Sequence, residues 1–399
     1  MRAGAGPEFC RRPRGVLRGA ALSLVFAGVI GTAAATGVLP RQQAPRQAPE
    51  AGPSPRTAVA AAGTVDRAAL ARAAAEAIAD GKSGKKAAEE FVSRSGDRWG
   101  AVYDKREYAE FEQTLDGAYT GVGLSARRGA DGRVEISRIR GGGPAERAGL
   151  LVGDRLTAID GRPVDGLSVS EIVSLLRGEG VTGSTVALGV ERGRAAWTQP
   201  LRRARLATDP VTVRRLADGT VLIRVAAFTK GTGERVRQAV RSAPARAGVL
   251  LDLRGNSGGL VAEAATAASA FFDGGLVATY DVDGTQHAVY ADGGGDTLRP
   301  LVALIDGGTM SAAELLTGAL QDRGRAVTVG SRTFGKGSVQ MPSALPDGSV
   351  AELTVGHYRT PAGHAVDGHG ITPDVTVDAA DARAEERART VLSGLGGAS

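Results

Sequence analysis

The spacing of apolar residues divides the chain into segments of different character. Between residues 64 and 95 apolar positions recur at helical spacing, and a second helical pattern continues through Tyr108, Phe111 and Leu115. We therefore expect a helical N-terminal unit over residues 64–116.

Residues 117–205 carry short runs typical of β-strands, separated by Gly, Pro and Asp turns. The runs are Val134–Ile139, Arg155–Ile159 and Thr185–Val190. One helix is expected over residues 168–177, because Ile172, Val173 and Leu176 lie at helical spacing on one face. The pattern predicts a compact, mostly β module with a single helix.

Residues 206–380 alternate buried-looking strands with helices. The strands are Val249–Leu253, Leu301–Ile305 and Ala326–Val329, and the helices are Leu260–Phe272 and Ser311–Asp322. This alternation is typical of an α/β domain with partly parallel pairing. The fold class is therefore a mixture of α+β and α/β, and residues 381–399 are expected to form a C-terminal tail.

The N-terminus has the pattern of an export signal. An arginine-rich start is followed by an uncharged apolar run over residues 19–39, with small residues at Ala33-Ala34-Ala35 where a signal peptidase can cut. Residues 1–39 are thus a signal peptide or a membrane anchor, and the Pro-, Gln- and Arg-rich residues 40–63 a flexible linker. We expect an extracytoplasmic protein that is either membrane-anchored or secreted.

Charge and cysteine content narrow the choice of partners. The net charge is +6, and the first 60 residues, with eight arginines against two glutamates, account for all of it. The folded body therefore has no net positive charge to attract nucleic acid. Cys10 is the only cysteine, which excludes an intrachain disulfide and a cysteine-ligated zinc site.

A glycine-flanked segment, Gly121-Val122-Gly123-Leu124, opens the β module. Two glycines around an apolar residue let successive backbone N–H groups converge on a carboxylate. An extended peptide would then add as a strand, with its last side chain in an apolar groove beside Ile172 and Leu176. With the segments 143–150 and 153–156 that follow, the module resembles a PDZ domain.

Ser257 is one candidate nucleophile, because Gly255-Asn256-Ser257-Gly258-Gly259 resembles the nucleophile segment of chymotrypsin-like proteases. Those proteases carry their histidine and aspartate upstream, whereas all four histidines of this chain follow Ser257. The glycine-rich turn is better suited to offering backbone donors to an oxyanion.

Ser311 is the stronger candidate. It stands between a predicted strand and a predicted helix, where helix N–H groups favour negative charge developing on a substrate carbonyl. The alternative is structural, since Ser311 and Glu314 also have the spacing of a capping box.

Lys336 is the last residue of the segment Gly330 to Lys336, whose residue pattern nearly fits a phosphate-binding loop. Gly337 stands where that loop needs Ser or Thr, and the residues that follow do not start a helix. If this segment is extended, Gln340 shares a face with Lys336 and can hydrogen-bond its amine. A desolvated lysine retains some neutral amine to take a serine proton.

The ordered set of motifs resembles the carboxyl-terminal processing peptidases, or tail-specific proteases, from about Gly96 to Val377. The motifs include Leu253-Arg254-Gly255-Asn256, the Ser311 segment, residues 332–337, residues 358–363 and Gly370-Ile371-Thr372-Pro373-Asp374. The resemblance implies a crotonase-like peptidase core without metal or cofactor.

The same resemblance assigns roles to single residues. It implies Ser311 as nucleophile, Lys336 as general base and Gln340 as the residue that orients the lysine. The oxyanion donors would be the backbone N–H groups of Gly258 and Ala312. In the PDZ-like module, Arg177 matches an arginine that senses bound peptide, or else is a surface residue.

The sequence thus predicts a serine endopeptidase that cleaves proteins near accessible C-termini, compatible with a homo-oligomer. Two rivals remain: a catalytically silent PDZ-containing scaffold, and a nucleotide-binding enzyme that uses the Gly330 to Lys336 loop. A metal site at His357, His364 and His369 is not expected, because a Ser-Lys mechanism needs no metal.

Overall fold

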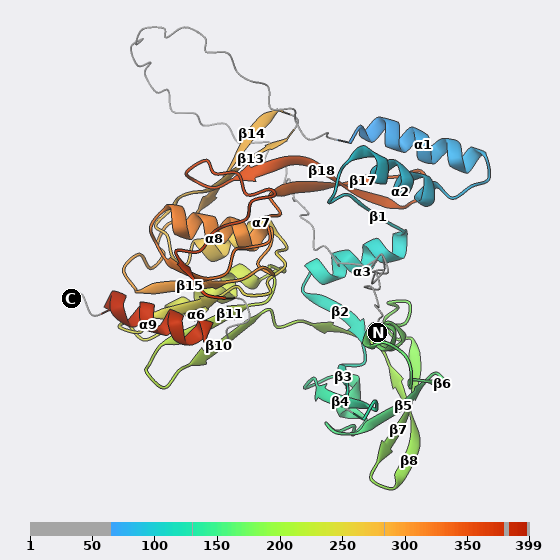
Figure 1. Ribbon diagram of the computed structural model, residues 1–399. Helices are drawn as coiled ribbons and strands as arrows, with labels where there is room; N and C mark the ends of the chain where they lie inside the picture. The colour runs from blue at the N-terminus through green and yellow to red at the C-terminus, as the bar shows by residue number, and fades with distance from the viewer. Residues whose placement is uncertain (1–64, 130, 283, 379–382, 397–399) are drawn as a thin grey trace, which may run out of the picture.

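The protein is described here by a computed structural model, in which residues 65–129, 131–282, 284–378 and 383–396 are placed (Figure 1). The predicted signal or anchor and the predicted linker lie outside the described residues. None of the helices in the described part of the chain is both long and apolar enough to span a bilayer.

Three helices open the described chain, namely α1 (Arg67–Ala79), α2 (Gly84–Ser95) and α3 (Lys105–Leu115). Each begins after a residue whose side chain accepts hydrogen bonds from first-turn N–H groups: Asp66, Ser83 and Asp104. Strand β1 (Ala101–Tyr103) lies between α2 and α3 and pairs with β18 (Val350–Arg359). The N-terminal region therefore extends a sheet of the C-terminal region.

Residues 118–207 form the β module that the sequence predicted. Its elements are β2 (Ala118–Gly121), β3 (Leu124–Arg128), β4 (Val134–Ile139), α4 (Pro144–Arg147), β5 (Arg155–Ile159), β6 (Arg162–Pro163), α5 (Val169–Arg177), β7 (Thr185–Arg192), β8 (Ala195–Arg202) and β9 (Ala204–Ala207). The main sheet has the order β3-β4-β5-β7-β8, and β2 pairs with β9. A capping box of Ser168 and Glu171 begins α5.

The region that carries the candidate catalytic residues is built on a six-stranded sheet. Its order is β10 (Val211–Arg215), β11 (Val221–Val225), β12 (Val249–Asp252), β15 (Leu301–Ile305), β16 (Val327–Gly330) and β19 (Val375–Thr376). Every pair after β10-β11 is parallel, which confirms the predicted α/β character. Helices α6 (Thr232–Arg241), α7 (Val261–Ala268) and α8 (Ala312–Asp322) pack on one face of this sheet.

The opposite face is covered by α9 (Ala384–Gly396) through Ala384, Ala388 and Leu392. The segment 381–399, which the sequence led us to expect as a tail, thus contains a docked helix. Its apolar positions recur every four residues, as a helix that covers a sheet requires.

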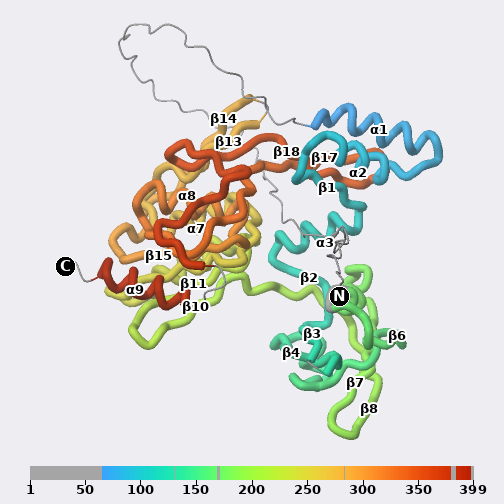
Figure 2. The backbone as a smooth tube through the Cα atoms, viewed as in Figure 1, coloured from blue at the N-terminus to red at the C-terminus, as the bar shows by residue number. Residues whose placement is uncertain are grey.

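A second sheet joins distant parts of the chain. It contains β1, β18, β13 (Gly275–Val282) and β14 (Thr285–Ala291), with β17 (Ser338–Ala344) paired to β18. Leu345, Ala351 and Leu353 of the β17–β18 hairpin pack against Leu70 and Ala88 of α1 and α2. The hairpin reaches from the core toward these helices in Figure 2.

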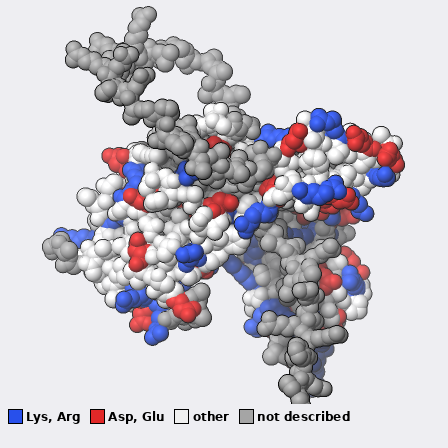
Figure 3. All heavy atoms as spheres, turned by 45° about the horizontal axis from the view of Figure 1, so that its top comes forward, with Lys and Arg blue, Asp and Glu red and all other residues white. Residues whose placement is uncertain are grey.

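Figure 1 shows the strands β3 to β8 gathered apart from the sheet of β10 to β16, with α3 and β2 leading toward them. Lysine and arginine side chains are interspersed with acidic ones on the face drawn in Figure 3. The architecture places α8 and the start of β17, which carry the candidate residues, between the two sheets of the core.

Candidate active site

Ser311 occupies a strained turn between β15 and α8. Its backbone φ is 57°, a left-handed value that among the described non-glycine residues only Asp160 shares. Such a conformation costs about 1–3 kcal/mol and persists only where the surroundings enforce it. Gly258 lies so close to this turn that a Cβ added to Gly258 would be 2.9 Å from the Ser311 Cβ. The surrounding structure therefore fixes the direction of the serine side chain.

The Ser311 hydroxyl does not act as a helix cap. Glu314 Oε2 accepts the Ser311 N–H at 2.9 Å, which forms the carboxylate half of a capping box. The reciprocal bond is missing, because Ser311 Oγ is buried and has no hydrogen-bond partner among the described residues. The hydroxyl is thus held in place by its backbone yet free to react.

Lys336 lies in the loop between β16 and β17 and is completely buried. Its Nζ makes no hydrogen bond to any described residue and sits 5.2 Å from the centre of the Trp99 ring. Burial lowers the pKa of the Lys336 ammonium to about 8, and the carboxylates of Asp97, Glu352 and Asp367 partly oppose that shift. Near neutral pH the neutral amine is therefore a minor form of Lys336, but a far larger fraction than in an ordinary lysine.

Glu314 ties the two candidate groups together. One carboxylate oxygen, Oε2, accepts the backbone N–H of Ser311 and that of Lys336, both at 2.9 Å. The other oxygen, Oε1, accepts the Thr333 hydroxyl at 2.5 Å and the Gly335 N–H at 2.7 Å. A single buried side chain thus fixes the Ser311 turn and the Lys336 loop relative to each other.

Tyr358 makes a second connection between the same two segments. Its hydroxyl lies 3.0 Å from the carbonyl oxygen of Ser311 and 3.0 Å from that of Lys336. Burial raises the pKa of the Tyr358 phenol well above its usual value, so the group remains a donor. The relative position of Ser311 and Lys336 is therefore set through their backbones.

The sequence did not reveal these two connections. Glu314 was visible only as the end of a Ser-x-x-Glu capping box, and Tyr358 only as part of a motif. The Ser-x-x-Glu spacing was the one signal that pointed to Glu314, but it gave no sign of the bonds to Thr333, Gly335 and Lys336.

The phosphate-loop interpretation of Gly330 to Lys336 loses its structural basis here. The amides of Gly335 and Lys336, which would have to face a phosphate, donate to the Glu314 carboxylate instead. The segment after Lys336 is strand β17 and not a helix, as we predicted.

Gln340 reaches the lysine indirectly. Its side-chain Nε2 donates to the backbone oxygen of Trp99, while its Oε1 is buried without a partner among the described residues. The Trp99 indole N–H donates to Asp367 Oδ1 at 3.3 Å, and its ring lies over Lys336 Nζ. Gln340 and Asp367 therefore hold the ring against the lysine, whereas no described hydrogen bond joins Gln340 to Lys336 itself.

The two predicted oxyanion donors differ in availability. The Ala312 N–H makes no hydrogen bond with the rest of the described chain. The Gly258 N–H instead donates to Asn256 Oδ1 at 2.9 Å, and Asn256 Nδ2 in turn donates to the Val225 carbonyl. Gly258 would have to exchange this acceptor for a substrate oxygen before it served an oxyanion.

The histidines do not assemble a site. The described contacts place His357 Nε2 3.7 Å from Asp367, His364 Nδ1 3.4 Å from Asp322, His369 Nδ1 2.8 Å from the Asp367 carbonyl, and the His287 ring on Tyr280. None of these contacts involves Ser257. Within the described ranges, no group of three or more His, Cys, Asp or Glu side chains is placed to hold a metal ion.

In the β module, the candidate peptide-binding residues fall into two sets. Gly123 has a φ of 78° and, with Leu124, lines a pocket of about 220 Å³. Val122, Ile172 and Leu176 are instead buried in the core of the module, with exposed fractions of 2%, 0% and 5%.

Charged side chains border the same pocket. Arg138 and Arg140 line it together with Tyr119 and Gly123. The Arg177 guanidinium lies 5.8 Å from the centre of the Tyr119 ring, so α5 contacts the wall of the pocket. Asp209 lines the pocket as well and lies 3.6 Å from Arg140, so the Gly123 loop faces a hollow bordered by both basic and acidic side chains.

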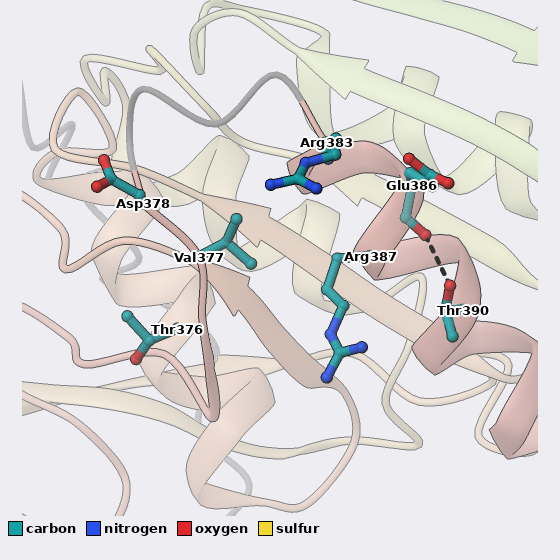
Figure 4. Close-up of a pocket in the computed structure, with 7 residues that line it drawn as sticks. All are labelled: Thr376, Val377, Asp378, Arg383, Glu386, Arg387 and Thr390. Carbon is teal, nitrogen blue, oxygen red and sulfur yellow. Dashed lines mark hydrogen bonds between the residues drawn. The ribbon is translucent and has the colours of Figure 1, made fainter.

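A different pocket, of about 420 Å³, lies beside α9 (Figure 4). It is lined by Thr376, Val377, Asp378, Arg383, Glu386, Arg387 and Thr390. It contains none of the candidate site residues that the sequence analysis selected.

The fold is that of an α/β protein with a separate β module, and the candidate residue Ser311 stands on a strained turn of its core. The Peptidase family S41 profile matches residues 219–377, and the PDZ domain profile matches residues 135–192. A carboxyl-terminal-processing protease of Synechocystis is 33% identical over 300 residues, covering 73% of this chain and 70% of the relative. The chain belongs to the S41 peptidases, in the group of carboxyl-terminal processing proteases.

Two further proteins are similar to this chain. A chloroplastic C-terminal processing peptidase of Tetradesmus obliquus is 36% identical over 282 residues, covering 66% of this chain and 61% of the relative. The solved photosystem II D1 C-terminal processing protease is 30% identical, covers 79% of this chain and 86% of its own, and has a TM-score of 0.49. The chain spans about 60–70% of the length of these curated relatives.

Proposed function

We propose that this protein is a serine endopeptidase in which Ser311 is the nucleophile and Lys336 the general base. The observation that carries the proposal is the unpartnered, buried Ser311 hydroxyl, on a turn that Glu314 ties to the loop of a buried Lys336. We also infer that the two-sheet core has the crotonase-like arrangement that the family resemblance implies.

The residues suggest a two-stage reaction. Neutral Lys336 takes the Ser311 proton as Oγ attacks the peptide carbonyl carbon, and the oxyanion forms toward the amides of Ala312 and Gly258. Collapse of this intermediate breaks the C–N bond, and Lys336 gives its proton to the departing amine. Water, deprotonated by Lys336, then hydrolyses the acyl-enzyme and restores Ser311.

We further propose that the PDZ module recruits the C-terminus of an unstructured substrate. The support is the hollow beside Gly123 and Leu124, which is bordered by Arg138 and by Arg140, itself paired with Asp209. A backbone amide loop with nearby cations favours a free carboxylate. An added substrate strand would lie along β3.

The substrate's last residue should accordingly control the rate of cleavage. One disordered protein is compared with three endings: an apolar carboxylate, an apolar amide and a tail of two aspartates. At limiting substrate, amidation should slow turnover because the carboxylate is lost, and the aspartates should slow it because their charged side chains must lose water on binding. Equal rates for all three endings would show that residues 117–205 do not recognise the substrate's end.

We propose that the protein acts outside the cytoplasm, either anchored to the membrane or released after cleavage near Ala35. The support is the apolar segment 19–39 after an arginine-rich start. Cell fractionation combined with N-terminal sequencing should find the protein outside the cytoplasm, membrane-bound with an intact N-terminus or soluble with a trimmed one. Recovery of the intact chain as a soluble cytoplasmic protein would contradict both.

A further inference from the structure

Asp209 is an acidic residue in the hollow that the proposed function gives to a substrate carboxylate. Among the described residues that line this hollow of about 220 Å³, three are charged, namely Arg138, Arg140 and Asp209. The two arginines attract a terminal carboxylate, whereas an adjacent carboxylate repels it and competes for the same cations. The position of Asp209 therefore calls for a physical explanation.

The loop beside the hollow has backbone donors to offer. The N–H groups of Val122 and Gly123 donate to no other described residue, while the Gly123 carbonyl accepts the Arg140 N–H at 2.8 Å. Gly123 has a φ of 78°, and successive amides around such a left-handed residue can converge on an anion. Arg140 is thus tied through its backbone to the loop whose free amides would hold the carboxylate.

Asp209 makes two ion pairs, one with the β module and one with the core. Its Oδ2 lies 3.6 Å from Nη2 of Arg140 in the module, and its Oδ1 lies 3.2 Å from Nη1 of Arg235 on α6. Arg140 is the more enclosed partner, with 30% of its side chain exposed against 56% for Asp209. Asp209 thus bridges the module and the core, and it engages the arginine that is hydrogen-bonded to the Gly123 loop.

The chain on both sides of Asp209 is held in place by hydrogen bonds. The Thr208 N–H donates to the Gly117 carbonyl at 2.6 Å, and the Pro210 carbonyl accepts the Ala226 N–H at 2.8 Å. The backbone of Asp209 is therefore fixed beside the hollow. An arginine side chain, in contrast, has several rotatable bonds, which let its guanidinium turn from one carboxylate to another.

We propose that Asp209 and the terminal carboxylate of a substrate compete for Arg140. When the substrate binds, the Arg140 guanidinium turns from Asp209 to the substrate carboxylate, and Asp209 keeps its pair with Arg235. One ion pair is exchanged for another, so a free C-terminus binds more weakly than the amides and arginines alone would hold it. The exchange also breaks the ionic bridge between the module and α6. This inference rests on the proposed recruitment of substrate C-termini by the module.

The competition is tested by peptide binding to the full-length chain carrying Ser311→Ala, so that the peptide stays intact. A short fluorescein-labelled peptide that ends in valine is titrated as the free carboxylate and as the amide, and its anisotropy gives Kd. Asp209→Asn should lower the Kd of the carboxylate peptide about two- to fivefold, the effect of one exposed ion pair, and leave that of the amide unchanged. Asp165→Asn should change neither Kd, because Asp165 is similarly exposed and pairs with Arg155, at 3.7 Å, outside the hollow.

Arg235→Gln separates competition from a mere loosening of the bridge. It detaches Asp209 from α6 but leaves the Asp209 charge beside Arg140, so the Kd of the carboxylate peptide should not fall. An unchanged Kd in Asp209→Asn, or equal tightening by Arg235→Gln and Asp209→Asn, would overturn the proposal. If the parent chain binds carboxylate and amide equally well, the proposed recruitment of C-termini fails, and this inference fails with it.

Discussion

Ser311→Ala and Lys336→Ala should each lower the cleavage of a disordered test protein by at least about 10³-fold, because the nucleophile and its base act as one unit. The double variant should be little worse than either single one. Thermal unfolding of Ser311→Ala should stay close to that of the wild type, since its hydroxyl has no hydrogen bond to lose within the described chain. Activity is measured from the rate at which intact substrate disappears.

Ser257→Ala is the matched control, because it removes a hydroxyl from the neighbouring glycine-rich turn. It should retain most of the activity. Gln340→Ala should reduce the rate only partly, since Gln340 holds Trp99 and transfers no proton. An essential Ser257 with a dispensable Ser311 would refute the assignment, and a folded wild type without activity would favour the silent scaffold.

Glu314→Gln should lower kcat by about 10²-fold with a much smaller change in KM, because a small displacement between nucleophile and base is costly. The substituted amide turns one acceptor into a donor that faces existing donors, so two of the four hydrogen bonds are lost. We expect a loss of unfolding free energy of about 2–4 kcal/mol. Steady-state kinetics and urea denaturation measure the two effects.

Glu263→Gln provides the control for this substitution. Glu263 also accepts two backbone N–H groups, from Gly231 at 2.9 Å and Gly233 at 2.8 Å, in a turn that carries no candidate catalytic group. It should destabilise the protein while leaving kcat of the folded fraction nearly unchanged. If Glu263→Gln and Glu314→Gln reduced kcat equally, Glu314 would be a general stabiliser and not a clamp for the dyad.

Local patterns predicted most of the elements. The strands β4, β5 and β15 and the helix α5 have the expected bounds to within a residue, because apolar periodicity and caps such as Ser168 are local signals. The placement of β1 beside β18 was not predictable, since it depends on a pairing across about 250 residues of chain.

The candidate site was predictable only as a set of residue types. Ser311, Lys336 and Gln340 were all selected, and the structure brings their segments together through Glu314, Tyr358 and Trp99. The burial of Glu352 could not be predicted from the sequence, since a glutamate in a strand normally faces solvent. The sequence also did not reveal that the Gly258 N–H donates to Asn256, because tertiary contacts decide whether a backbone N–H is free.

The central claim is that Lys336 activates Ser311. The most direct measurement is reaction of the full-length protein with a fluorophosphonate probe, followed by peptide mapping of the labelled residue by mass spectrometry. We predict a single modified peptide with the label on Ser311 in the wild type and in Ser257→Ala, and no labelling in Lys336→Ala. A label on Ser257, or undiminished labelling of Ser311 in folded Lys336→Ala, would contradict the account.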